Sequence, residues 1–479
     1  MISESEAPEV ARQPVEAAAP AQLEPAGLRR RVLSLAWPVI GQNLLETLLG
    51  VVDTLLVAGL GVAAIAGIGG ALQIMFFVLA ALSALSVGSS ILVAQSVGAR
   101  AFERASGLAR QSLLWSVILA VPLALVGVTM ADVIISVFGM EPEVAQIATE
   151  YLQVTMGTVV VLVLLILGGG VLRGAGDSRT PLIVTAIANV LNVILAYGLI
   201  YGHFGLPALG AVGSAWATFM ARSVALLLML GVLWRGRNGV SISGRSGWWP
   251  DWSVARRVLG LGIPAAVEQV LVTTAFLVMT ILVARLGTDT LAAQRISMTA
   301  LSFSFLPGIG FSLAATALVG QSIGARRPRE GSEMAKIATL WAVMWMGAIA
   351  VLFFVFATPI MRLFTTDPEV IRIGAAGLRV VALTQPFWGV GMVQSGGLRG
   401  TGDTRFPLVV GSTGVWCAVL LAWIGLTVFG GGLPIVWGAF LITSPITATL
   451  TWRRFRRRVR ELEELSVVSR QSSELAIGD

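Results

Sequence analysis

The sequence predicts an all-α integral membrane protein with about twelve transmembrane helices, arranged as two parallel six-helix repeats with a cleft between them. Composition is the first observation: 56% of the 479 residues are hydrophobic and 12% are charged, about half the charge of a soluble domain. Apolar runs of about 20 residues, long enough to cross a bilayer, recur from Val32 to Trp452. An internal duplication, described below, divides these runs into two equal sets.

The apolar runs set the predicted spans and domains. The spans are 31–60, 68–97, 108–138, 144–172, 180–201, 207–234, 255–285, 294–322, 334–362, 370–398, 406–429 and 431–452. The domains are a disordered cytoplasmic tail (1–28), an N-lobe (29–234), a cytoplasmic linker (235–254), a C-lobe (255–452) and a basic cytoplasmic tail (453–479). The first tail is rich in Ala, Pro and Glu and lacks periodicity, a composition typical of disorder.

Basic residues fall mostly at alternate connections between these spans. The positive-inside rule therefore places the basic loops and both termini in the cytoplasm, and predicts a multi-pass protein of the inner (plasma) membrane. The formal net charge of +7 sets the topology on this interpretation. We expect no nucleic-acid partner.

Several chemistries are excluded by residues that occur once. A single cysteine, Cys417, rules out a disulfide within the chain and a thiolate zinc site. The single histidine, His203, lies between two spans, and no Gly-rich phosphate loop precedes the single lysine, Lys336. We therefore expect neither an enzyme nor a cofactor or metal site. A pump of this composition would depend on an ion gradient.

The duplication has a constant offset of 226 residues. The matching pairs are 93–100 with 319–326, 172–182 with 398–408, 56–61 with 282–287, and Pro38 with Pro264. Each repeat holds six spans, an even number, so the second copy enters the membrane from the same side as the first. Parallel repeats of this kind are typical of transporters in which one half rocks against the other around a central site.

The matched Arg-Gly-x-Gly-Asp turns are interpreted as architecture, because both halves carry them. Their residues are Arg173, Gly174, Gly176 and Asp177 in the first half, and Arg399, Gly400, Gly402 and Asp403 in the second. Glycine allows positive φ, and aspartate caps the following helix. The arginines help to fix the topology.

The segments Val-Gly-Gln-Ser-Ile-Gly-Ala-Arg (319–326) and Leu-Arg-Gly-Thr-Gly-Asp-Thr-Arg (398–405) resemble those of the multidrug and toxic compound extrusion (MATE) family. The same is true of Leu-Ala-Trp-Pro (35–38) with Val-Asp-Thr (52–54), and the resemblance spans roughly residues 30 to 455. It implies a V-shaped, twelve-helix antiporter that expels amphipathic, often cationic compounds against inward proton or sodium flow. The chain looks closer to DinF-like than to NorM-like members.

Acidic residues inside spans indicate function, since each costs about 2.5–3.5 kcal/mol on insertion scales. Asp53 lies within the first span, and its spacing from Glu46 and Gln42 places all three on one helix face. Two carboxyls in a low-dielectric site favour proton binding by at least one of them. The offset pairs them with Met279 and Val272, so we predict an ion site in the N-lobe alone. The alternative is that Asp53 is a paired packing residue.

Amides and a second carboxylate complete the candidate site. Asn189 and Asn192 share a helix, and the resemblance implies that Asn192 faces the first-helix Asp, although DinF-like members have a further Asp where Ala196 stands. Such amides also act as helix–helix contacts. In the second half, Glu268 with Gln269 would attract a cationic substrate. The alternative is that Glu268 pairs with Arg295 or lies near the cytoplasmic surface.

Two arginines lie within spans, Arg222 and Arg295, and each should find a carboxylate, a carbonyl or the interface. Arg295 could instead contact an anionic substrate. Trp388, which stands where NorM-like members have an acidic residue, would present aromatic surface to the cleft or pack in the core.

These features predict a secondary active antiporter, most simply a monomer, that exports amphipathic small molecules in exchange for protons rather than sodium. Asp53, Glu46 and Asn192 would couple the ion, and Gln42, Asn189, Glu268, Gln269, Arg295 and Trp388 would contact substrate. The alternatives are a lipid-linked oligosaccharide flippase of the same superfamily and a non-transporting membrane scaffold.

Overall fold

The computed structural model describes residues 25–244 and 246–475, and this part of the chain is helical without a β-strand. The first half forms α1 (Pro25–Ala58), α2 (Val62–Gly98), α3 (Phe102–Thr129), α4 (Ala131–Ser136), α5 (Pro142–Gly157), α6 (Val159–Gly174), α7 (Arg179–Tyr201) and α8 (Gly210–Arg235). The second half forms α9 (Trp252–Ala284), α10 (Thr288–Gly324), α11 (Pro328–Val355), α12 (Ala357–Arg362), α13 (Pro368–Ala382), α14 (Gln385–Gly400), α15 (Arg405–Phe429) and α16 (Leu433–Leu475).

Ten of these helices are long and apolar enough to cross a bilayer, and two bent pairs raise the number of spans to twelve. The pairs are α5 with α6, bent by 50°, and α13 with α14, bent by 49°. The predicted all-α membrane fold is confirmed. The predicted lobe, linker and tail ranges stay predictions, and residues 1–24 and 476–479 of the two tails lie outside the described residues.

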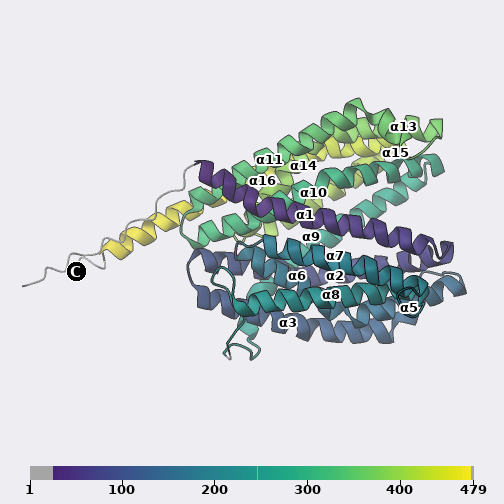
Figure 1. The fold of residues 1–479 in the computed structure, drawn as a ribbon. Coiled ribbons are helices and arrows are strands. Elements are labelled where there is room, and N and C mark those ends of the chain that lie inside the picture. Colours follow the sequence, from purple (N-terminus) through teal and green to yellow (C-terminus); the bar gives the residue numbers. More distant parts are fainter. Residues whose placement is uncertain (1–24, 245, 476–479) are drawn as a thin grey trace, which may run out of the picture.

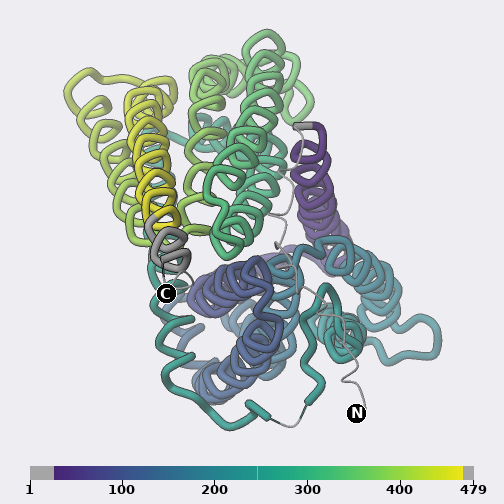
Figure 2. The backbone as a smooth tube through the Cα atoms, turned by 90° about the vertical axis from the view of Figure 1, so that its left-hand side faces the viewer, coloured from purple at the N-terminus to yellow at the C-terminus, as the bar shows by residue number. Residues whose placement is uncertain are grey.

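The duplication is visible in the helix bounds. The bounds of α2, α3, α4 and α6 recur in α10, α11, α12 and α14 at the 226-residue offset. The two halves form two bundles that meet at one end and diverge toward the other, which gives the molecule a V shape (Figure 1). Figure 2, which looks onto the end where the bundles meet, shows α1 crossing from one bundle to the other.

The first parts of α1 and α9 cross over to the opposite bundle. Leu28 and Val32 of α1 are buried in a core formed mainly by α10 and α11 of the second half. Val254 and Val258, the residues of α9 at the 226-residue offset, are buried in a core of the first half. The two bundles are thus held together by a reciprocal exchange of helix ends.

The end where the bundles meet, here named the closed end, is formed by the last turns of α2 and α10. A Cβ at Gly98 would overlap the carbonyl oxygen of Gln321, and a Cβ at Gly324 would overlap that of Gln95. The two glutamine side chains reach across to the opposite half: Gln95 Nε2 donates to the Gly400 carbonyl at 3.1 Å, and Gln321 Nε2 donates to Gly174 at 2.8 Å. Glycine at this crossing lets the two backbones approach closely.

The duplicated turns lie at the same end. Gly176 and Gly402 have φ of 89° and 90°, as predicted for turn glycines. Gly174 and Gly400 instead end α6 and α14, where a Cβ would lie 2.6 Å from a carbonyl oxygen of the neighbouring helix, so these two glycines permit close packing.

The aspartate of each turn caps the next helix, as predicted. Asp177 Oδ1 accepts from the backbone N–H groups of Arg179 and Thr180, and Asp403 Oδ1 accepts from that of Phe406. Burial of Asp177 favours the neutral acid, but hydrogen bonds from Thr180 and Arg237 outweigh it and hold the pKa of this carboxyl below its ordinary value.

Candidate functional site

The polar face predicted on α1 is present, and two of its three members are in contact. Gln42 Nε2 donates to Glu46 Oε1 at 3.0 Å. Glu46 is exposed, whereas Asp53, two turns further along, is partly buried. The two carboxylates therefore occupy different environments on the same helix.

Asp53 is connected to α7 and α8 through one amide. With its amide oriented to satisfy both neighbours, Asn192 donates from nitrogen to Asp53 Oδ1 at 3.1 Å, and its oxygen accepts from Thr218 Oγ1 at 2.9 Å. Asn192 is 2% exposed, so these partners are the ones available to it. The structure thus brings together Asp53 and Asn192, and adds Thr218, which the sequence did not single out.

Two further hydrogen bonds tie the second part of α1 to α7. Asn189 Nδ2 donates to the carbonyl of Leu45 at 2.7 Å, and Tyr201 Oη donates to that of Leu56 at 2.6 Å. The amide nitrogen of Asn189 is thereby engaged in a helix–helix contact, one of the two roles considered for it. Together with Asn192, these contacts fix this part of α1 against the first bundle.

The arginines of the duplicated turns extend to the first helix of their own half. Arg173 donates to Gln42 Oε1 at 3.2 Å, and Arg399, at the 226-residue offset, donates to Glu268 Oε2 at 2.7 Å. Each pair is separated by 131 residues. The interpretation of these arginines as topology signals alone was therefore incomplete, because they also bind the candidate site residues of both halves.

Glu268 is accordingly paired, and the alternative that it pairs with Arg295 is wrong. Its side chain is 12% exposed, and its carboxylate forms a salt bridge with Arg399. Arg295 and Gln269 are both exposed, and within the described residues neither side chain makes an ion pair or hydrogen bond that the structure records. The negative charge of Glu268 is compensated inside the protein.

We expect Glu268 and Arg399 to be energetically coupled. Glu268→Gln and Arg399→Gln should each lower the thermal unfolding temperature in detergent. The loss of unfolding free energy in the double variant should be smaller than the sum of the two single losses, by a coupling energy on the order of 1 kcal/mol. Breaking one partner leaves a poorly solvated charge behind, which is costly. Strictly additive losses would contradict this pairing.

Trp388 packs within the second bundle. Its ring lies 5.1 Å from that of Phe305 and 5.6 Å from that of Phe440, centroid to centroid. The side chain is partly buried, in agreement with the packing alternative. Its contact with substrate stays a prediction.

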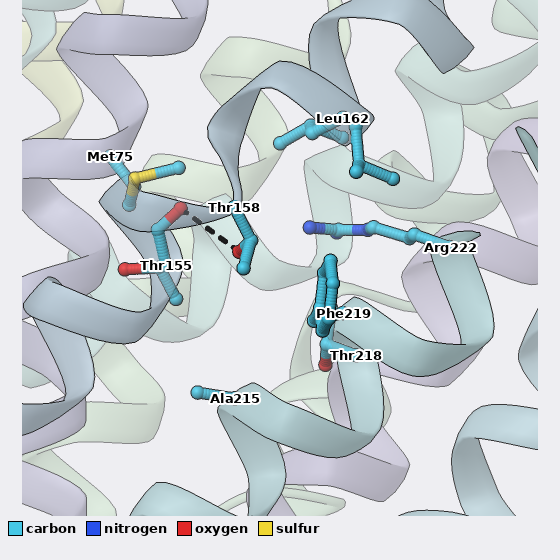
Figure 3. Close-up of a pocket in the computed structure, with 9 residues that line it drawn as sticks. Met75, Thr155, Thr158, Leu162, Ala215, Thr218, Phe219 and Arg222 are labelled. Atoms are coloured by element: carbon cyan, nitrogen blue, oxygen red, sulfur yellow. Dashed lines mark hydrogen bonds between the residues drawn. The ribbon is translucent and has the colours of Figure 1, made fainter. Parts of the chain in front are cut away.

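A small cavity lies inside the first bundle beside Arg222 of α8. Its volume is about 20 Å³, and Met75, Thr155, Thr158, Leu162 and Thr218 are among the residues around it (Figure 3). Asp53, Glu46 and Tyr151 are close enough to Arg222 to interact with it electrostatically. In the part of the chain that the structure describes, no three His, Cys, Asp or Glu side chains converge as metal ligands would.

Comparison with known proteins shows which family this chain belongs to. The MatE family model matches residues 38–198 and again 264–424, one match in each half of the duplication. The chain belongs to the MatE family. MatE proteins are transporters, so the two-bundle fold and its V-shaped cleft are those of a membrane transporter.

Two relatives have names that specify multidrug resistance. The probable multidrug resistance protein NorM of Thermotoga maritima is 30% identical over 449 residues, which cover 91% of this chain and 96% of that protein. The multidrug resistance protein MdtK of Yersinia pestis is 28% identical over 388 residues, which cover 81% and 85%.

Solved structures share the MatE fold closely. A multidrug resistance MATE family transporter described in an outward-facing conformation superimposes with a TM-score of 0.85 at 24% identity, covering 91% of this chain and 97% of that one. A transporter of the MOP superfamily from Pyrococcus furiosus, with a binding pocket described as of reverse polarity, gives 0.83 at 24% identity and the same coverage.

Proposed function

We propose that this MatE protein is a secondary active exporter that exchanges protons for amphipathic, often cationic small molecules. The observation that carries the proposal is a carboxylate within a span, Asp53, hydrogen-bonded to Asn192, which in turn is hydrogen-bonded to Thr218, inside one bundle of a two-bundle transporter. A carboxylate at this depth costs about 2.5–3.5 kcal/mol on insertion scales, so its presence indicates a function, and proton carriage is one that a carboxylate can perform. The names of the multidrug relatives support the substrate class.

Through the amide of Asn192, protonation of Asp53 can change the hydrogen bonds between three helices. When Asp53 is ionised, the Asn192 nitrogen faces the carboxylate and its oxygen accepts from Thr218. When Asp53 is protonated, its O–H can donate to the Asn192 oxygen, and the nitrogen then donates to Thr218 Oγ1 at 2.9 Å. Protonation thus reverses the hydrogen bonds that join α1, α7 and α8.

The closed end provides the gate for alternating access. The positive-inside rule assigns this end to the cytoplasm, so the described conformation is closed inward and open outward. Opening inward requires the Gln95–Gly400 and Gln321–Gly174 hydrogen bonds to break together. Coupling follows if protonated and ionised Asp53 favour different conformations.

Substrate would enter between the two bundles. Glu46 is exposed and accepts a hydrogen bond from Gln42, so its charge is available to a cation from the open side. We propose that Asn189, Glu268, Gln269, Arg295 and Trp388 contribute contacts to substrate. The pairing of Asp53 with Asn192, and Trp388 in place of an acidic residue, favour DinF-like over NorM-like coupling.

Uptake of ethidium into energised inverted membrane vesicles tests the proposal. We expect uptake that depends on this protein, stops on addition of a proton uncoupler, and does not change when sodium is replaced by choline. Uptake that survives the uncoupler but requires sodium would contradict proton exchange. Absence of ethidium uptake by well-folded protein would contradict the cationic substrate class.

A further inference from the structure

Arg222 is a charged residue in the middle of α8 that the mechanism above does not use. It lies 12 residues after the start of α8 at Gly210 and 13 before its end at Arg235. An arginine near the centre of a span costs about 2.5–3.5 kcal/mol on insertion scales. Among the described residues its guanidinium forms no ion pair or hydrogen bond that the structure records. Such a residue needs compensation from its surroundings.

The cavity beside Arg222 supplies part of that compensation. Figure 3 shows the Arg222 side chain directed into it, opposite Thr155 and Thr158. The hydroxyls of Thr155 and Thr158 already donate to the carbonyls of Tyr151 and Val154, so their lone pairs remain free to accept. The volume of about 20 Å³ is large enough for one water molecule, which could bridge these oxygens and the guanidinium.

The remaining compensation comes from the two carboxylates of α1, Glu46 and Asp53. Thr218 lies one helical turn before Arg222 on the same face of α8, borders the same cavity, and is hydrogen-bonded to the amide that holds Asp53. Arg222 is also within electrostatic range of Asp53 itself and of Glu46. A fixed positive charge is therefore built into the immediate support of the candidate ion site.

We propose that Arg222 is a tethered cation: it provides the positive charge for ionised Asp53 that a bound sodium ion would otherwise provide, and so makes the site selective for protons. The inference rests on the proposed function and names the residue that selects its coupling ion.

The ligands around Asp53 agree with this role. Sodium, a hard cation, needs several oxygen ligands, and here the amide of Asn192 presents a nitrogen donor to ionised Asp53. Ala196, one helical turn after Asn192, is fully buried and offers no side-chain oxygen. A second cation beside Arg222 would be repelled. A proton needs a single carboxylate oxygen and no coordination shell.

The test is sodium-specific stabilisation of the purified protein, measured as the thermal unfolding temperature in NaCl and in choline chloride at equal ionic strength and fixed pH. Wild type and Arg222→Lys, which keeps the charge, should unfold at the same temperature in both salts. Arg222→Gln should be stabilised by sodium, with an apparent sodium affinity at least about tenfold higher than that of wild type. The effect should vanish in Arg222→Gln/Asp53→Asn.

Sodium-specific stabilisation of wild type would overturn the inference, as would Arg222→Gln that is folded and unresponsive to sodium. If the single variant Arg222→Gln fails to fold, the double variant Arg222→Gln/Asp53→Asn should still fold, because it no longer contains the unpaired carboxylate of Asp53. Failure of both would show that Arg222 serves packing and would also overturn the inference. Because the unfolding temperature is measured without transport, a failure of this inference can be distinguished from a failure of the proposed function.

Discussion

Asp53→Asn is expected to lower the rate of proton-driven ethidium transport by about tenfold or more. Asparagine keeps the size of the side chain and a hydrogen bond with Asn192, but it cannot bind and release a proton. The two hydrogen-bond arrangements of Asn192 would then no longer alternate with proton binding and release, and the proton gradient could no longer drive transport through this site. The initial rate of uptake into inverted vesicles, at matched protein levels, measures the effect.

Asp53→Glu is the matched control, because it restores a titratable group one methylene further from the backbone. It should recover part of the transport that Asp53→Asn loses, and both variants should unfold within a few degrees of wild type. If Asp53→Asn transports at the wild-type rate and is still stopped by an uncoupler, Asp53 is not the proton carrier. The mechanism would then have to be rebuilt around Glu46 and Glu268.

Gly98→Val and Gly324→Val are expected to prevent formation of the closed end. A Cβ at either position would overlap a backbone carbonyl oxygen of the other half, Gln321 or Gln95, and backbone cannot move aside as a side chain can. Overpacking costs about 1–3 kcal/mol, occasionally more, which is enough to change the ratio of two conformations roughly 5- to 150-fold. Transport should fall accordingly, because the cycle passes through the closed end.

A distance between spin labels reports this change directly. Ala99 and Ala325 are exposed, follow α2 and α10 at the closed end, and can carry labels in a Cys417→Ser background. Unsubstituted protein should give one short distance, and either glycine variant should add a longer one. Gly69→Val is the control, since a Cβ at this position of α2 meets nothing within 4 Å. Full activity with an unchanged short distance would refute the gate.

Much of the fold could be predicted from the sequence because the duplication constrains it. The 226-residue offset, read from four matched segments, reappears in the helix bounds and in paired contacts such as Arg173–Gln42 and Arg399–Glu268. The face of α1 that carries Gln42 and Glu46 follows from helical periodicity alone. The need of Arg222 for compensation was evident from its depth, although the site beside it was not.

Other features depend on contacts between helices that periodicity does not specify. The crossing of α1 and α9 into opposite bundles requires knowing which apolar faces meet, and apolar residues in a membrane protein do not reveal this. The partner of Glu268 was missed because Arg399 is 131 residues away and was interpreted as a topology signal. Thr218 could have been found from its spacing of four residues before Arg222 on the same helix.

The most direct test of proton exchange counts protons in proteoliposomes that contain purified protein and a pH-sensitive dye in sodium-free buffer. Addition of ethidium should drive a proton flux in the opposite direction through wild-type protein, and Asp53→Asn should give none. Ethidium movement without any proton flux, or a flux that appears only when sodium is added, would contradict the account.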